Sequence, residues 1–187
     1  MSNKIKSFEY TVIQLQKWKE STRNKDTEVL QSNSINRLKA LYLVFLMTAK
    51  NSSTGGENFL IKNIFDNFHA QPYGPLEQDI FDYMKNGSQF QSIEINDNST
   101  IVINEFVEGL DIKVKIEIDK AIEDLRRVNS DLINIPTFEL GDLCRTYYSW
   151  RKTYQEAKEV ETLRKKIDND IIIKEDKTFS LNLFYKN

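Results

Sequence analysis

The sequence predicts a mainly α-helical (α+β) fold: a single compact helical domain that carries one or two small antiparallel β-hairpins. Apolar residues recur at helical spacing along most of the chain. Two shorter segments, residues 89–107 and 168–186, are instead rich in β-branched residues on either side of a turn sequence. The length of 187 residues and the 40% hydrophobic content fit one domain, residues 1–187, with its own core.

Composition excludes several classes of protein. One Cys cannot form an intramolecular disulfide, and one Cys with one His leaves no closed zinc site of Cys and His ligands. A net charge of −2 argues against a protein that coats nucleic acid, so we expect nucleic-acid binding to be weak or absent. The most apolar stretch, residues 38–49, is shorter than the roughly 20 residues that span a bilayer. We therefore expect a cytoplasmic protein with no membrane partner and no signal peptide.

The first third of the chain predicts three helices. An amphipathic N-terminal helix is expected over residues 8–31. The side chains at 32–34 can cap a second helix over residues 35–50. Because that second helix is apolar on nearly every side, it should lie at the centre of the fold. The apolar spacing of residues 59–68 fits a third, short helix.

A turn follows, because Pro72, Gly74 and Pro75 forbid a continuous helix. Gly74 can take a positive φ, and Tyr73 is expected to wedge its ring against the core. Pro75 is predicted to begin the next helix, which ends at residues 86–87. We interpret Tyr73, Gly74 and Pro75 as a structural motif that fixes the chain direction.

The second half of the chain mixes hairpins with helices. Residues 89–107 predict a hairpin around the turn at 96–99. A helix is expected over 118–128, and a linker follows at 131–136. Thr137 is expected to cap the next helix, which carries an aromatic run to Trp150. A C-terminal hairpin is expected over 168–186.

The search for catalytic chemistry yields no catalytic residue, metal site or cofactor. Phosphate-binding glycine loops and metalloprotease or hydrolase motifs are absent from the sequence. Cys144 and His69 are the one pair that could support nucleophilic catalysis. Cys144 occupies an interior-facing helical position, which favours core packing over a reactive thiolate. Glu77 and Asp79 are interpreted as carboxylates near a helix N-terminus.

Residues 151–166 are densely charged. Arg164, Lys165 and Lys166 could contact phosphates, but the Glu residues at 156–161 favour ion pairing along a helix instead. This interpretation again predicts weak nucleic-acid binding.

The aromatic run before this segment has two interpretations. Its members could pack against the central helix, or form a partly exposed set of anchors for a protein partner. Tyr148 and Arg151 lie off the helical face that Trp150 shares with its aromatic neighbours. We therefore predict a partner-binding surface of Tyr148 and Arg151, with Trp150 supporting it from below.

Three ordered segments resemble one known family. They are Arg37–Tyr42 (RLKALY), the turn Tyr73-Gly74-Pro75 with Ile80-Phe81 after it, and the segment from Leu140 to Trp150. Over residues 34–157 the chain resembles the Panacea domain, the family of SocA-like antitoxins and phage-associated GepA-like proteins.

The resemblance implies a single Panacea-like domain with a protein partner. Such a protein would be a non-enzymatic antitoxin that neutralises a cognate toxin by direct complex formation, or presents it to a protease. The alternatives are a phage-encoded antagonist of a host defence protein and a nucleic-acid-binding regulator that uses residues 151–166. An enzyme that uses Cys144 and His69 ranks last. A neighbouring gene for a small toxic protein would favour the antitoxin.

Overall fold

The computed structural model describes residues 2–22, 34–52 and 57–181. These residues form a mainly helical domain with a few short antiparallel strands, which confirms the predicted fold class. None of the described helices is both long enough and apolar enough to cross a membrane.

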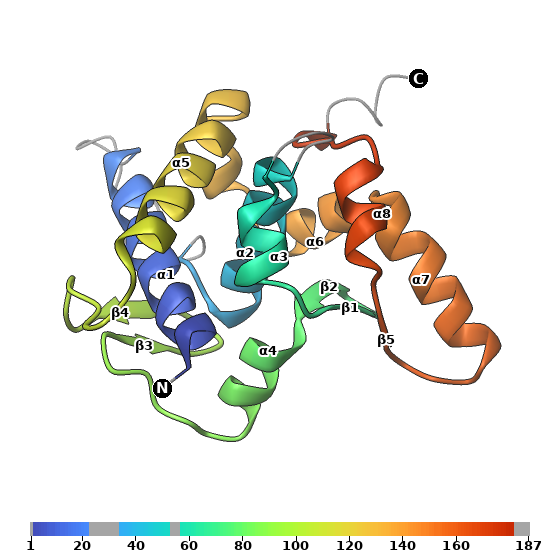
Figure 1. Cartoon of the computed structure of the whole chain (residues 1–187), viewed down its shortest axis with the longest axis horizontal. Coiled ribbons are helices and arrows are strands. Elements are labelled where there is room, and N and C mark those ends of the chain that lie inside the picture. Colours follow the sequence, from blue (N-terminus) through green and yellow to red (C-terminus); the bar gives the residue numbers. More distant parts are fainter. Residues whose placement is uncertain (1, 23–33, 53–56, 182–187) are drawn as a thin grey trace.

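Helix α2 (Arg37–Asn51) lies at the centre, as predicted. The Asn36 side chain caps it by accepting a hydrogen bond from the backbone N–H of Lys39. Every residue from Lys39 to Ala49 is buried. Figure 1 shows α1 (Asn3–Ser21) and α5 (Ile112–Val128) on one side of α2, and the C-terminal helices on the other.

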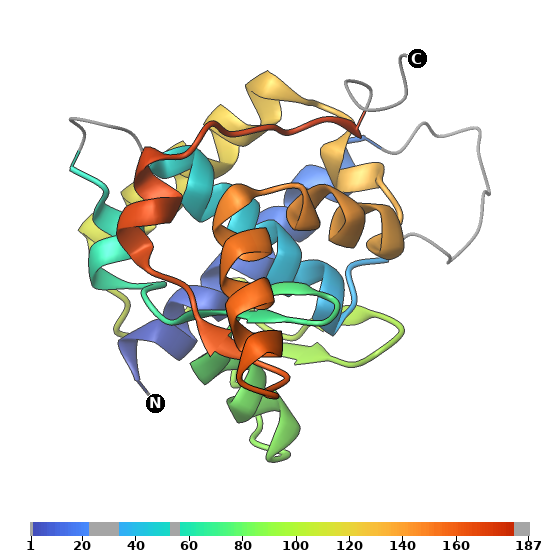
Figure 2. The ribbon, with the colours of Figure 1, turned by 90° about the vertical axis from the view of Figure 1, so that its right-hand side faces the viewer.

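The other helices are short. They are α3 (Phe59–Asn63), α4 (Gln78–Lys85), the 3₁₀ turn η2 (Leu132–Asn134), α6 (Thr137–Arg145), α7 (Tyr148–Glu159) and α8 (Asn169–Lys174). Figure 2, turned by 90°, places α7 in front of α2 and close to the small sheet.

Two antiparallel sheets complete the fold of the described residues. The first has the strand order β2-β1-β5 and contains β1 (Phe68–Gln71), β2 (Gly74–Glu77) and β5 (Lys165–Lys166). The second is the predicted hairpin of β3 (Ile93–Ile95) and β4 (Thr100–Val102). Buried Glu9 of α1 anchors this hairpin, because its Oε1 accepts hydrogen bonds from the N–H groups of Gln91 and Ser92.

The structure corrects the predicted N-terminal boundaries. Helix α1 begins at Asn3 and ends at Ser21, so the last third of the predicted helix over 8–31 lies outside the described residues. Helix α3 ends at Asn63, and Phe68 belongs to β1 rather than to a helix.

The helix expected to begin at Pro75 begins at Gln78. Pro75 lies instead in β2, opposite Ala70 of β1. A proline fits there because β2 is an edge strand. The N–H group that Pro75 lacks would not have been needed for pairing with β1. Glu77 caps α4, since its side chain accepts a hydrogen bond from the backbone N–H of Ile80.

The helix expected to run from Thr137 to Trp150 is two helices. Tyr147 has extended backbone angles between α6 and α7. Thr137 is the first residue of α6, and the N-cap position is held by Pro136, whose side chain makes no capping bond.

The predicted C-terminal hairpin over 168–186 is wrong in its first strand. Residues 169–174 form α8 instead. The Asp168 side chain caps this helix by accepting a hydrogen bond from the N–H of Asp170, and the helix buries Ile172 and Ile173 in the core. Residues 175–180 are not strand, and residues 182–186 lie outside the described part of the chain.

Candidate partner-binding surface at the Tyr73 turn

Strands β1 and β2 meet at a two-residue turn, Pro72-Tyr73. The pairs run from Phe68 opposite Glu77 to Gln71 opposite Gly74. Gly74 has a φ of +138°, which confirms the predicted positive φ. An L side chain rarely adopts this angle, so the sharp turn depends on glycine.

The Tyr42 ring fills the space over this glycine. A Cβ atom on Gly74 would lie 2.8 Å from Cε1 of Tyr42, and one on Gly141 of α6 would lie 3.1 Å from the same ring. The Tyr42 hydroxyl donates a hydrogen bond to the carbonyl oxygen of Tyr73. Burial raises the pKa of Tyr42, so the hydroxyl stays protonated and remains a donor.

Two more side chains hold the backbone of the turn. Nη1 of Arg145, at the end of α6, donates to the carbonyl of Tyr73 at 2.9 Å. Nε1 of Trp150, in α7, donates to the carbonyl of Gln71 at 3.0 Å. Helices α2, α6 and α7 therefore each contribute one donor to the same short turn.

The Tyr73 side chain itself points to solvent. It is 70% exposed, so the predicted wedging of its ring against the core is wrong. The Tyr42 ring already occupies the space behind the turn, which leaves Tyr73 no place in the core. Arg145 connects Tyr73 to a second exposed aromatic residue, because its guanidinium lies 5.8 Å from the ring centroid of Phe138, which is 74% exposed. We call Tyr73, Phe138 and Arg145 the turn surface.

Two of the three predicted α7 residues are exposed, and the third contacts the turn. Tyr148 is 54% exposed and Arg151 is exposed. Trp150 is half-buried between the turn and Tyr154, with the two rings stacked at 5.0 Å. Tyr147, by contrast, is buried against Phe45 and donates from its hydroxyl to the carbonyl of Thr178.

Cys144 and His69 have separate surroundings. Cys144 is fully buried on α6, and this burial raises the pKa of its thiol well above the ordinary value. His69 lies on β1, where its Nε2 is 3.2 Å from Oδ1 of Asn67. Burial lowers the pKa of His69, and the nearby Arg164 and Lys166 lower it further. A neutral imidazole and a protonated thiol do not form the ion pair that cysteine nucleophiles use.

An acidic cluster lies at the start of α4. Asp66, Glu77 and Asp79 each place a carboxylate oxygen within 4.8 Å of the others. The Lys4 ammonium lies among them and forms an ion pair with all three. Burial alone would lower the pKa of Lys4, but these hydrogen bonds outweigh it and raise the pKa above its usual range. The cluster is thus compensated by a cation of the chain itself.

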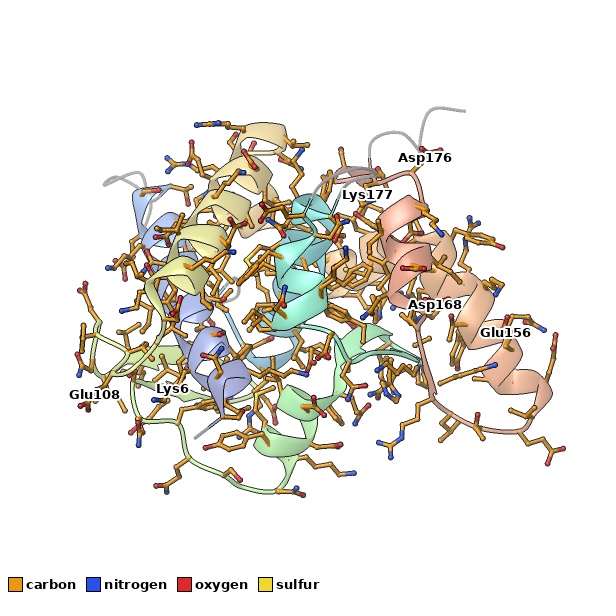
Figure 3. All side chains as sticks on the ribbon, viewed as in Figure 1. Lys6, Glu108, Glu156, Asp168, Asp176 and Lys177 are labelled. Atoms are coloured by element: carbon orange, nitrogen blue, oxygen red, sulfur yellow. The ribbon has the colours of Figure 1, made fainter. Side chains whose placement is uncertain are left out.

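The basic residues at 164–166 are also engaged. Glu156, labelled on α7 in Figure 3, forms ion pairs with Lys152 and Lys165. Arg164 lies 4.0 Å from the carboxylate of Asp82. The pair of Lys152 and Glu156 lies along α7, as predicted. The pair of Lys165 and Glu156 instead joins β5 to α7, because α7 ends at Glu159.

Sequence reasoning missed three contributors to the turn: Tyr42, Phe138 and Arg145. In the sequence, Tyr42 is one residue of a stretch that predicts a buried apolar helix. Its hydroxyl group could have indicated the contact with the turn, because a buried tyrosine hydroxyl needs a hydrogen-bond partner.

Comparisons of this chain with protein-family models, with curated proteins and with solved structures gave no match.

Proposed function

We propose that this protein is a non-enzymatic protein-binding module, an antitoxin that neutralises a cognate toxin in the cytoplasm by direct complex formation. The turn surface, together with Tyr148 and Arg151, is the proposed contact with the partner. Trp150 supports this surface from beneath through its bond to the turn.

The observation that carries the proposal is an exposed aromatic residue on a fixed backbone. Three donors from three helices bind the carbonyls of the turn, yet the Tyr73 ring is left in solvent. Binding energy at protein interfaces concentrates in Tyr, Trp and Arg. A backbone that is already ordered also reduces the entropy lost when a partner docks.

The three segments that resemble the Panacea domain meet at this turn. Tyr42 comes from the first segment, Tyr73 and Gly74 from the second, and Arg145 and Trp150 from the third. Residues that lie up to 79 positions away from the turn in the sequence thus contact it. We take the meeting of these segments at one turn as support for the antitoxin proposal.

The experiment starts from the neighbouring gene that encodes a small protein. We expect that gene to inhibit growth when expressed alone and to be neutralised when this protein is co-expressed. A pull-down of the two purified proteins is expected to recover a complex. Neutralisation without a complex would overturn the proposed mechanism, and a neighbour that is not toxic would favour the phage-encoded antagonist.

Variants locate the contact. The double substitutions Tyr73→Ala with Phe138→Ala, and Tyr148→Ala with Arg151→Ala, are each expected to weaken the complex at least about tenfold. Phe106→Ala with Arg127→Ala is the matched control for the second pair, because it also removes one exposed ring and one exposed guanidinium. Circular dichroism checks that each variant is folded. Equal binding by all three variants would place the contact elsewhere.

A further inference from the structure

The first turn of α7, which carries Tyr148 and Arg151, is not capped by the residue before it. The first N–H groups of a helix have no partner within the helix. The N-cap residue of α7 is Tyr147, and its side chain makes no capping bond. The first bond within the helix runs from the N–H of Arg151 to the carbonyl of Tyr147. The N–H groups of residues 148–150 therefore need partners from outside the helix.

Glu175 supplies the missing cap from 26 positions further along the chain. Its Oε2 accepts a hydrogen bond from the N–H of Ser149 at 2.9 Å, and its Oε1 accepts one from the Ser149 hydroxyl at 2.6 Å. Ser149 is fully buried, so removal of Glu175 leaves this N–H group without its partner. A carboxylate at a helix N-terminus also interacts favourably with the helix dipole. Glu175 thus does for α7 what an N-cap side chain does for other helices.

The capping residue belongs to a segment, residues 175–179, that we call the capping strap. The Thr178 carbonyl accepts a hydrogen bond from the hydroxyl of buried Tyr147, at the junction between α6 and α7. The Phe179 carbonyl accepts one from Nδ2 of Asn129, directly after α5, and Phe179 is itself buried. Figure 2 shows the chain crossing the molecule from α8 towards the end of α5. These bonds to the body of the domain keep the capping carboxylate in place.

The buried serine determines the direction of its neighbours on the helix. Tyr148 precedes Ser149 and Arg151 follows it by two positions, so a fixed Ser149 leaves both of these side chains in solvent. The next residue, Trp150, donates to the carbonyl of Gln71. The first turn of α7 is therefore held at two points, by the capping strap through Ser149 and by the turn between β1 and β2 through Trp150.

We propose that Glu175 is a positioning residue for the partner-binding surface, because it holds Tyr148 and Arg151 in the orientation in which they meet the partner beside the turn surface. This role rests on the proposed function, since it concerns the same contact. Interface residues that are already ordered lose less entropy when a partner docks. Loosening the first turn of α7 therefore weakens binding even where the rest of the fold is intact.

The test uses the full chain and the purified product of the neighbouring gene. Glu175→Ala is expected to weaken the complex about fivefold, the usual effect of a lost helix cap. Glu175→Gln is expected to bind within about twofold of the wild type, because the amide oxygen still accepts from the N–H of Ser149. Figure 3 labels the two residues used as controls, Asp176 and Asp168. Asp176→Ala removes the exposed neighbour of Glu175, and Asp168→Ala removes the cap of α8, so both should bind like the wild type.

Two further measurements separate positioning from a general loss of stability. In a protein that already carries Tyr148→Ala and Arg151→Ala, Glu175→Ala is expected to weaken binding less than about twofold further, because its effect acts through those two side chains. In the free protein, amide exchange at Ser149 is expected to be at least about tenfold faster in Glu175→Ala. Asp168→Ala should leave this exchange rate unchanged.

Each measurement has an outcome that overturns the role of Glu175. These outcomes are wild-type binding by Glu175→Ala, an equal loss in Glu175→Gln or Asp168→Ala, an undiminished loss in the protein that lacks Tyr148 and Arg151, and unchanged exchange at Ser149. Absence of any complex with the wild-type protein would overturn the proposed function, and this role with it. A normal wild-type complex that ignores Glu175→Ala would overturn the positioning role alone.

Discussion

The Tyr42 hydroxyl binds the carbonyl of Tyr73, and the Tyr42 ring covers Gly74 so closely that no side chain fits there. One buried residue of the central helix thus determines both the course of the turn and the outward direction of the Tyr73 ring. The same contact makes the turn sensitive to a single added methyl group.

Gly74→Ala is expected to lower the free energy of unfolding by about 3 kcal/mol. The positive φ contributes strain of about 1–2 kcal/mol, and the contact with Tyr42 adds overpacking of similar size. Gly87→Ala is the matched control, because Gly87 also has a positive φ but a Cβ there would meet nothing within 4 Å. Urea denaturation measures both variants, and equal losses would show that the Tyr42 contact is unimportant.

Trp150→Phe is expected to cost about 1 kcal/mol and to accelerate amide exchange in β1 and β2. The substitution keeps a ring against Tyr154 but removes the donor to the carbonyl of Gln71. Tyr154→Phe, in the other ring of the same stack, keeps that donor and is expected to leave the exchange rates of the strands unchanged. Identical exchange in the two variants would contradict a role for Trp150 in holding the turn.

Lys4→Met is expected to cost about 3 kcal/mol at neutral pH, because it leaves the fully buried carboxylate of Glu77 without its cation. Lys174→Met removes a lysine whose ion pair with Asp170 is 71% exposed on both sides, and is expected to cost less than about 0.5 kcal/mol. The deficit of Lys4→Met should shrink in acid, where Glu77 takes up a proton. A deficit that grows in acid would show that Glu77 is not the group concerned.

Glu9 gives the wild-type protein a pH-dependent stability of defined sign. Burial raises its pKa, although the N–H groups of Ser92 and Gln91 lower it in part. The folded protein holds this proton more tightly than the unfolded chain. The contribution of Glu9 is therefore present below its unfolded pKa and is lost as the pH rises through the folded pKa.

Glu9→Gln keeps an acceptor for both N–H groups but does not titrate. We expect the stability of this variant, relative to the wild type, to increase from about pH 4 to about pH 7. Denaturation curves at several pH values measure the difference. A constant difference, or one that increases toward acid, would contradict the raised pKa.

The local features of the fold were predictable from the sequence. The uninterrupted apolar stretch identified α2, and β-branched residues on both sides of 96–99 identified the β3–β4 hairpin. The positive φ of Gly74 followed from its place between two prolines. Each of these features depends on neighbours in the sequence, which a pattern search can detect.

The errors involve contacts between distant residues or short ambiguous segments. Nothing near Tyr73 in the sequence indicates that Tyr42 occupies the space behind it, 31 positions away. Residues 171–173 are three isoleucines, which favour a strand locally, but the cap at Asp168 and burial of this segment make a helix. Short apolar segments cannot be assigned from periodicity alone. The proposed surface was predicted only in its α7 residues, because the rest is assembled by tertiary contacts.

Cys144→Ala is expected to leave partner binding and neutralisation intact, at a packing cost of about 1 kcal/mol. The thiol is fully buried and its pKa is raised, so a thiol reagent such as Ellman's reagent should react slowly with the native protein at about pH 8. In denaturant the same thiol should react completely and at once. The substitution removes the thiol without adding bulk. If the Cys144→Ala protein is folded and binds its partner but no longer neutralises it, Cys144 acts chemically. Rapid modification of the native protein would likewise contradict a purely structural cysteine.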